Sequence, residues 1–246
     1  MKADGYYFDE VKGKPSPGQI TLYALVDLSD INSANVNVLT HLAKPRTEYL
    51  VKEEKMPFAE AKAQAEKEIL AVFNLELLES TAFESFNLTN NAALIAVSSI
   101  LQGYSSTAGI MQLMGDIMTD MQIDGRLDDE ATGSQIASNG NALDLKKVRE
   151  NLEKRYAELK IETQIPDFES LIHQFIEKTQ YKITSLVTFP KYGEFPEHGF
   201  NVLFENNTTF ITNKVSLAFN SQVDKHILLN VMITALINQL TLRQLL

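Results

Sequence analysis

The chain has 246 residues, of which 44% are hydrophobic, and this is enough for one substantial core with smaller flanking pieces. Acidic residues outnumber basic residues by 32 to 22, so the formal net charge is −10, and no basic patch is present to hold a nucleic-acid backbone. Cysteine is absent, which excludes thiol nucleophiles, thiolate metal sites and disulfides.

The N-terminal residues 1–34 are predicted to form a β segment. Two runs, YYFDEV at 6–11 and ITLYALV at 20–26, are rich in aromatic and β-branched residues, and a spacer with two prolines and two glycines separates them. The first ten residues lack the apolar stretch of a secretion signal. We therefore expect either a cytoplasmic protein or an export segment upstream of this chain.

From about Asn35 the hydrophobic period becomes that of a helix, and a helical bundle is predicted over residues 35–179. Asn90, Ser105 or Ser106, and Asp144 are expected N-caps, and Gly103 is expected to end a helix. The six expected helices lie at about 37–51, 57–73, 91–102, 107–121, 144–160 and 167–178.

Residues 180–246 again contain segments with the composition of β-strands: YKITSLVTF, GFNVLF, TTFI and NKVSLAF. The last twenty residues, 227–246, read as an amphipathic helix with polar residues at every fourth position, and these interruptions disfavour a membrane span. We expect it to pack or to self-associate. The predicted fold class is α+β, mainly α: a multi-helix bundle of about six helices flanked by short β segments at both ends.

A proline lies in the middle of the first predicted helix. Pro45 removes a hydrogen bond to the carbonyl of His41, so a kink near His41 or a helix start close to Pro45 is expected. His41 and Arg46 beside that carbonyl would suit an anion. The simpler interpretation is a bend that wraps the helix around the bundle.

An acidic segment partly follows the calcium-loop template. With Asp120 as position 1, Asp124 stands at position 5, Gly125 at 6 and Asp128 at 9, and Glu130 adds a further carboxylate. Position 3 is Gln122, and position 12, where a bidentate Glu is required, is Ala131. The alternative is that Gly125 ends one helix and that Asp128 or Asp129 starts the next.

No catalytic residues are predicted. The four histidines lack zinc spacing, and no G-x-S-x-G, Walker or G-x-G-x-x-G motif occurs. Nothing in the sequence places two carboxylates across a cleft. Tyr192, Phe195 and Phe200, in a loop over 190–204, would stack on a sugar or grip a partner, or pack on adjoining strands.

Several segments carry a family resemblance. They are GYYFDEV and ITLYALVDLSD, VNVLTHLAKPRTEYLV, FAEAKAQAEKEILAVFNL, NAALIAVSSILQG, and DLKKVRENLEKRYAEL with IPDFE. Together, over about residues 5–170, they resemble the helical module of secreted or lipid-anchored surface proteins of Bacteroidetes and Fibrobacter relatives, often accompanied by the Fibrobacter major paralogous domain. The resemblance implies an outer cell-surface location, an upstream lipoprotein signal, and an N-terminal β domain whose last strands are retained here. It implies no activity.

These observations favour a non-catalytic cell-surface or secreted structural or partner-binding protein. A glycan- or peptide-binding module that uses the aromatic loop is the alternative, and a carboxylate-dependent hydrolase is the second alternative. Calcium is the one cofactor that the sequence suggests. The expected partner is a protein or a glycan, not nucleic acid.

Overall fold

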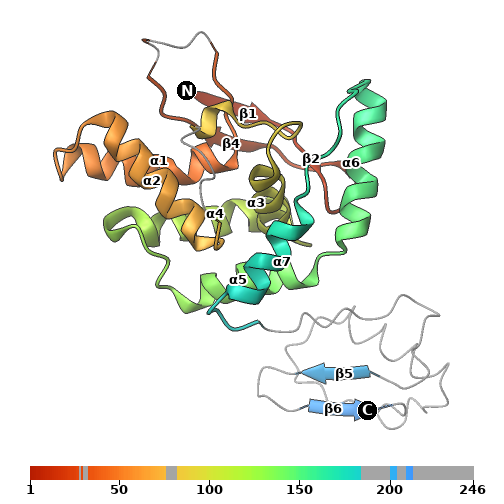
Figure 1. The fold of residues 1–246 in the computed structure, drawn as a ribbon. Helices are drawn as coiled ribbons and strands as arrows, with labels where there is room; N and C mark the ends of the chain where they lie inside the picture. The colour runs from red at the N-terminus through yellow and green to blue at the C-terminus, as the bar shows by residue number, and fades with distance from the viewer. Residues whose placement is uncertain (28, 30–32, 76–81, 184–199, 204–208, 213–246) are drawn as a thin grey trace. The chain divides into compact units, whose positions relative to one another are not determined.

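The computed structural model describes residues 1–27, 29, 33–75, 82–183, 200–203 and 209–212. The chain divides into two compact units, Met1–Thr184 and Ser185–Leu246. The described part of the first unit contains seven α-helices and two short antiparallel strand pairs (Figure 1). The predicted class, α+β and mainly α, is confirmed.

The helices are α1 (Val38–Lys52), α2 (Phe58–Val72), α3 (Ala92–Gln102), α4 (Thr107–Asp124), α5 (Glu130–Ala142), α6 (Leu145–Leu159) and α7 (Glu169–Lys178), with a 3₁₀ turn, η1 (Phe83–Ser85), before α3. Six of them follow the predicted order with small shifts at their ends, and α5 is an additional helix that is not among the six predicted. Short polar side chains explain most of the starts, because each accepts the backbone N–H three residues later. Ser106 and Asp144 cap α4 and α6 as predicted, whereas α3 is capped by Asn91 and not by Asn90.

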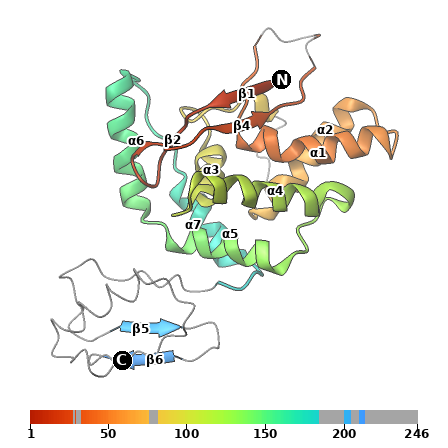
Figure 2. The ribbon, with the colours of Figure 1, turned by 180° about the vertical axis from the view of Figure 1, so that it is seen from behind.

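Helix α3 forms the centre of the bundle, as its nearly continuous apolar sequence predicts. It packs against α1, α4, α5 and α7 (Figures 1 and 2). Its C-terminal end is Gly103, with a φ of +46° that suits glycine. The largest fully buried side chains of the core come from the helix ends, from η1 and from α1, α2, α3, α4 and α7: Phe73, Phe83, Phe168, Phe175, Leu39, Leu42, Ile69, Leu70, Ile95, Ile100, Leu101 and Leu113.

The N-terminal strands differ in extent from the prediction. β1 (Lys2–Gly5) pairs with β4 (Ile20–Tyr23), and β2 (Phe8–Asp9) pairs with β3 (Lys14–Pro15), both antiparallel. The predicted strand over 6–11 is wrong except at Phe8–Asp9: residues 6 and 7 are not in a strand, and the chain turns after Asp9. The Asp9 carboxylate accepts the N–H of Lys12 at 2.9 Å, and Gly13 takes a positive φ of +66°.

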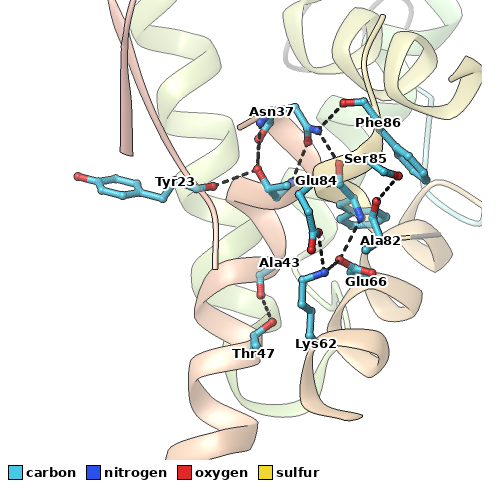
Figure 3. Close-up of polar contacts among 12 residues, drawn as sticks. Tyr23, Asn37, Ala43, Thr47, Lys62, Glu66, Ala82, Glu84, Ser85 and Phe86 are labelled. Atoms are coloured by element: carbon cyan, nitrogen blue, oxygen red, sulfur yellow. Dashed lines mark hydrogen bonds and ion pairs between the residues drawn. The ribbon is translucent and has the colours of Figure 1, made fainter. Parts of the chain in front are cut away.

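Thr40 and Asn37, at the start of α1, bond this helix to the β segment and to η1 (Figure 3). The Asn37 side chain caps α1 in a capping box with Thr40, and its amide group also donates to the carbonyls of Phe83 and Phe86, at 2.8 and 3.2 Å. The Thr40 hydroxyl donates to the carbonyl of Tyr23 at 3.1 Å. The first turn of α1 is thus bonded to β4 and to η1 together.

In the second unit, β5 (Phe200–Leu203) and β6 (Thr209–Thr212) form an antiparallel pair in two of the segments predicted as strands. Phe200 of the aromatic loop is the first residue of β5. Tyr192, Phe195 and the predicted helix over 227–246 lie outside the described residues.

Candidate ligand-binding site

A cavity of about 310 Å³ lies between the N-terminal β segment and the helical bundle. This volume is within the range of small-molecule sites. Most of the side chains around it are apolar. The lining comes from β2 and β4, the start of α1, the loop before α3, α3 itself and α4: Tyr7, Phe8, Glu10, Ile20, Leu22, Asn35, Val36, Asn37, Val38, Phe86, Asn87, Leu88, Leu94, Ser98, Leu101, Gln102 and Ile110.

Glu10 is the charged side chain of this lining, and it is only 2% exposed. Its carboxylate accepts hydrogen bonds from the Ser98 hydroxyl, at 3.2 Å, and from the Gln102 amide. Burial raises the pKa of Glu10 to about 7, because these hydrogen bonds offset only part of the cost of desolvating the charge, and the neighbouring Asp9 charge raises it further. The carboxyl group therefore titrates near neutral pH.

Gln102, the last residue of α3, holds both the backbone and the side chain of Glu10. Its Oε1 accepts the backbone N–H of Glu10 at 3.0 Å, while its Nε2 donates to the carboxylate and to the Ser98 hydroxyl, the latter at 3.0 Å. Ser98 and Gln102 are one helical turn apart, so they face the same side of α3. The orientation of Glu10 is therefore set by α3, a helix with nine buried residues.

The turn that carries Glu10 is also fixed from α6. The Asn151 amide donates to the carbonyls of Glu10 and Val11, at 2.8 and 3.2 Å. Gly13 packs directly on Asn151, and a Cβ at Gly13 would overlap that side chain. Lys12 Nζ donates to Asp9 and to the carbonyl of Ser105, both at 2.7 Å. Residues 9–13 are thus bonded to α3, to α6 and to the loop between α3 and α4.

A second buried acid lies elsewhere, in a cluster between α2 and η1 (Figure 3). Lys62 Nζ lies 2.6 Å from Glu66 Oε1 and 2.6 Å from Glu84 Oε2, and Glu66 also accepts the N–H of Phe83 at 3.2 Å. Burial raises the pKa of Glu66. Burial lowers the pKa of Lys62, but the two carboxylates outweigh it, so that this pKa is raised overall. The cavity beside Glu66 has only about 10 Å³, the space of about one water.

The acidic segment considered for calcium serves as helix ends. Asp120 and Asp124 lie on α4, and Asp120 Oδ2 accepts the N–H groups of Asp128 and Asp129, at 2.6 and 3.0 Å. Gly125 ends α4 with a φ of +76°, and Asp129 caps α5, whose first residue is Glu130, so this alternative is confirmed. In the described part of the chain, no three His, Asp or Glu side chains gather as a metal site. Calcium binding itself stays a prediction.

His41 and Arg46 have separate surroundings. Arg46 donates to Glu68, with Nε 2.7 Å from Oε2, and to the carbonyl of Ile123. The His41 ring stacks on Tyr23 with centroids 5.7 Å apart, and its two ring nitrogens have no hydrogen-bond partner among the described residues. Helix α1 continues from Val38 to Lys52 through Pro45, so a helix start at the proline is wrong. Arg46 already serves an acid and a helix end, and the pair forms no shared anion site.

The sequence did not point to Glu10, which lay in a predicted strand. One signal was available on the partner side, since Ser98 and Gln102 are polar residues spaced by four on an otherwise apolar helix. A polar pair on a buried helix needs a polar partner. The identity of that partner, 88 and 92 residues away along the chain, is set by the fold.

Comparison of the chain with protein-family models, with curated proteins and with solved structures gives no match. The resemblance to surface proteins of Bacteroidetes and Fibrobacter relatives therefore stays a prediction. None of the helices in the described ranges has the length and apolar character of a membrane span.

Proposed function

We propose that the protein is a non-catalytic binding protein whose cavity at Glu10 receives a small, mainly apolar molecule or group. The observation that carries this proposal is the cavity itself: about 310 Å³ of mainly apolar lining with one buried carboxylate. Apolar walls with few, well-fixed polar groups are typical of ligand sites. The hydrogen bonds of Gln102 and Asn151 prepare such a fixed group before any ligand arrives.

The arrangement of acids favours binding over hydrolysis. A carboxylate-dependent hydrolase uses two carboxyl groups that flank one bond. Among the described residues that line the larger cavity, Glu10 is the sole carboxylate, and Glu66 lines the other, much smaller cavity. This distribution supports the binding proposal against the carboxylate-dependent alternative.

A cell-surface or secreted location, with an upstream lipid anchor as a tether, is part of the proposal and rests on the resemblance alone. Self-association through 226–246 and glycan or peptide binding through Tyr192, Phe195 and Phe200 remain separate hypotheses. Washing and protease treatment of intact producing cells would test the location. Protection of the protein from added protease would contradict a surface location.

A fragment screen by two-dimensional NMR tests the proposed site. Small aromatic and alicyclic probes are expected to shift the amide signals of Phe8, Glu10 and Gln102, which line the cavity. Leu88→Phe, which adds volume to the cavity wall, should weaken these shifts, whereas the matched Leu159→Phe at a half-exposed position on α6 should not. Shifts that are absent, or equal in both variants, would overturn the proposal.

A further inference from the structure

On the basis of the proposed function, we propose that the ligand of this cavity is an amine: an apolar body with a cationic ammonium group that binds the carboxylate of Glu10. The cavity would accept the body among Phe8, Leu22, Leu88 and Leu94, and Glu10 would accept the ammonium protons. Three independent features of the site support this ligand class.

The first feature is the charge of the lining. No Lys, Arg or His is among the described residues around the cavity, so Glu10 sets its charge alone. Beside mainly apolar walls the effective dielectric constant is lower than in water, so the attraction between unlike charges is stronger there. A carboxylate or phosphate ligand would meet repulsion there. The net charge of −10 adds a favourable field for cations around the molecule.

The second feature is a difference between Glu10 and the other buried acids. Three acidic side chains are buried in the described residues: Asp9, Glu10 and Glu66. Asp9 has Lys12 at 2.7 Å, and Glu66 has Lys62 at 2.6 Å. Glu10 has only neutral partners, namely Ser98 and Gln102. Buried charges are ordinarily paired. A ligand cation would therefore balance the charge of Glu10, as lysine balances the charges of Asp9 and Glu66.

The third feature is the remaining hydrogen-bonding capacity of Glu10. A carboxylate offers about four lone-pair sites to donors. Ser98 and Gln102 occupy two of them, and the backbone N–H of Glu10 itself also interacts with the carboxylate, which leaves about one site free. An ammonium group carries three donors and no acceptor, so it suits a carboxylate that has acceptor capacity left and lies on a cavity wall.

Binding of an amine would depend on pH through Glu10. The pKa of Glu10 is about 7, and an ammonium ion prefers the ionised carboxylate, so affinity should rise with pH across neutrality. The other titratable or charged groups around Glu10 are Asp9 with Lys12 on its own turn, Tyr7 on the preceding segment, and Tyr156 and Arg155 on α6. Burial raises the pKa of both tyrosines, away from this range.

Isothermal titration calorimetry with phenethylamine, phenethyl alcohol and hydrocinnamate tests the inference. These probes share one apolar body and differ in a cationic, neutral or anionic head. At pH 8 the amine is expected to bind at least tenfold more tightly than the alcohol, and hydrocinnamate most weakly. With the Glu10 pKa at about 7, the affinity of the amine should rise roughly tenfold from pH 6 to pH 8.

Two isosteric variants complete the test. Glu10→Gln should remove both the preference for the amine and its pH dependence, while Glu66→Gln, at a buried acid outside the cavity, should keep both. The wild-type pH series tests the inference even where Glu10→Gln lowers stability. Equal binding of alcohol and amine would overturn the amine inference and leave the proposed function standing. Absence of binding by all three probes, together with no shifts in the fragment screen, would overturn both.

Discussion

Glu10 and Glu66 are both buried acids with a raised pKa, but the fold treats them differently. Glu66 lies between two elements, α2 and η1, beside Lys62, and the adjoining cavity holds about 10 Å³. Glu10 lies on a turn held by neutral amides and a hydroxyl, and it borders about 310 Å³ of mainly apolar space. One acid has its charge balanced within the protein, and the other does not.

This contrast separates a structural acid from a candidate binding group. Desolvation opposes the charge of both residues, as the raised pKa values show. At Glu66 the attraction of Lys62 offsets part of the desolvation free energy, and Lys62 also joins α2 to η1 through Glu84. At Glu10 the neutral partners offset only part of the desolvation free energy, so a positively charged ligand would stabilise the ionised carboxylate further.

The largest expected effect concerns Lys62. Lys62→Met would leave Glu66 buried without its cation, and the free energy of unfolding should fall by about 4 kcal/mol. Lys147→Met is the matched control, because Lys147 pairs with Glu150 at 3.2 Å on the exposed face of α6, and its loss should cost less than about 1 kcal/mol. Urea unfolding measures both. Equal losses in the two variants would mean that the Lys62 cluster contributes no more to the free energy of unfolding than a surface ion pair does.

The pH dependence of stability is the next largest effect. A carboxyl group with a folded-state pKa of about 7 and an ordinary value of 4.5 favours the folded state most below pH 4.5, and this contribution is lost as the pH rises through 7. The difference in unfolding free energy between wild type and Glu10→Gln should therefore fall by about 3 kcal/mol from pH 4.5 to pH 8.

Urea unfolding at a series of pH values measures this difference, and the variant serves as the reference for all other titrating groups. Parallel pH profiles for the two proteins would contradict a raised pKa at Glu10. They would also make Glu10 resemble an ordinary, solvated acid and remove its contrast with Glu66.

A smaller effect, about 2 kcal/mol, is expected at the turn that orients Glu10. Asn151→Ala removes the donor to the carbonyls of Glu10 and Val11. Gly13→Ala places a methyl group against Asn151 at a positive φ of +66°. In a double-mutant cycle the two losses should be less than additive, because Asn151→Ala gives the new methyl group room. Strictly additive losses would show that the turn is not packed on Asn151.

Much of the helical architecture could be predicted from the sequence, because local signals determine it. The apolar spacing of α3, the cap at Asp144 and the end at Gly125 all act within one turn of the chain. Helix α5 could not be predicted from its sequence, EATGSQIASNGNA, because this segment is polar and contains two glycines. It packs against α3 and α7, so tertiary contacts outweigh its weak local preference.

The candidate site could not be predicted, because its members meet only in three dimensions. Glu10 lay in an apparent strand, and the turn that carries it depends on Asn151, which is 141 residues away along the chain. Recognisable local patterns in the sequence mark other residues, such as Asp120 and Asp124, which serve as helix ends. A buried acid held by neutral groups has no sequence pattern of its own.

His41 extends the contrast to a base, with the smallest expected effect. It is 5% exposed, both ring nitrogens lack partners among the described residues, and it is not among the residues that line either cavity. Burial, and then the charge of Lys44, lowers its pKa, so its contribution to stability is present above pH 6.5 and is lost as the pH falls below that value.

His41→Phe would keep the stacking on Tyr23 and remove two unpaired polar atoms, so at pH 8 the free energy of unfolding should rise by about 1 kcal/mol. The gain should grow as the pH falls toward 5, because phenylalanine cannot be protonated. His173→Phe, at an exposed position on α7, should change neither value. A loss of stability in His41→Phe at pH 8 would contradict the absence of hydrogen-bond partners at the ring nitrogens.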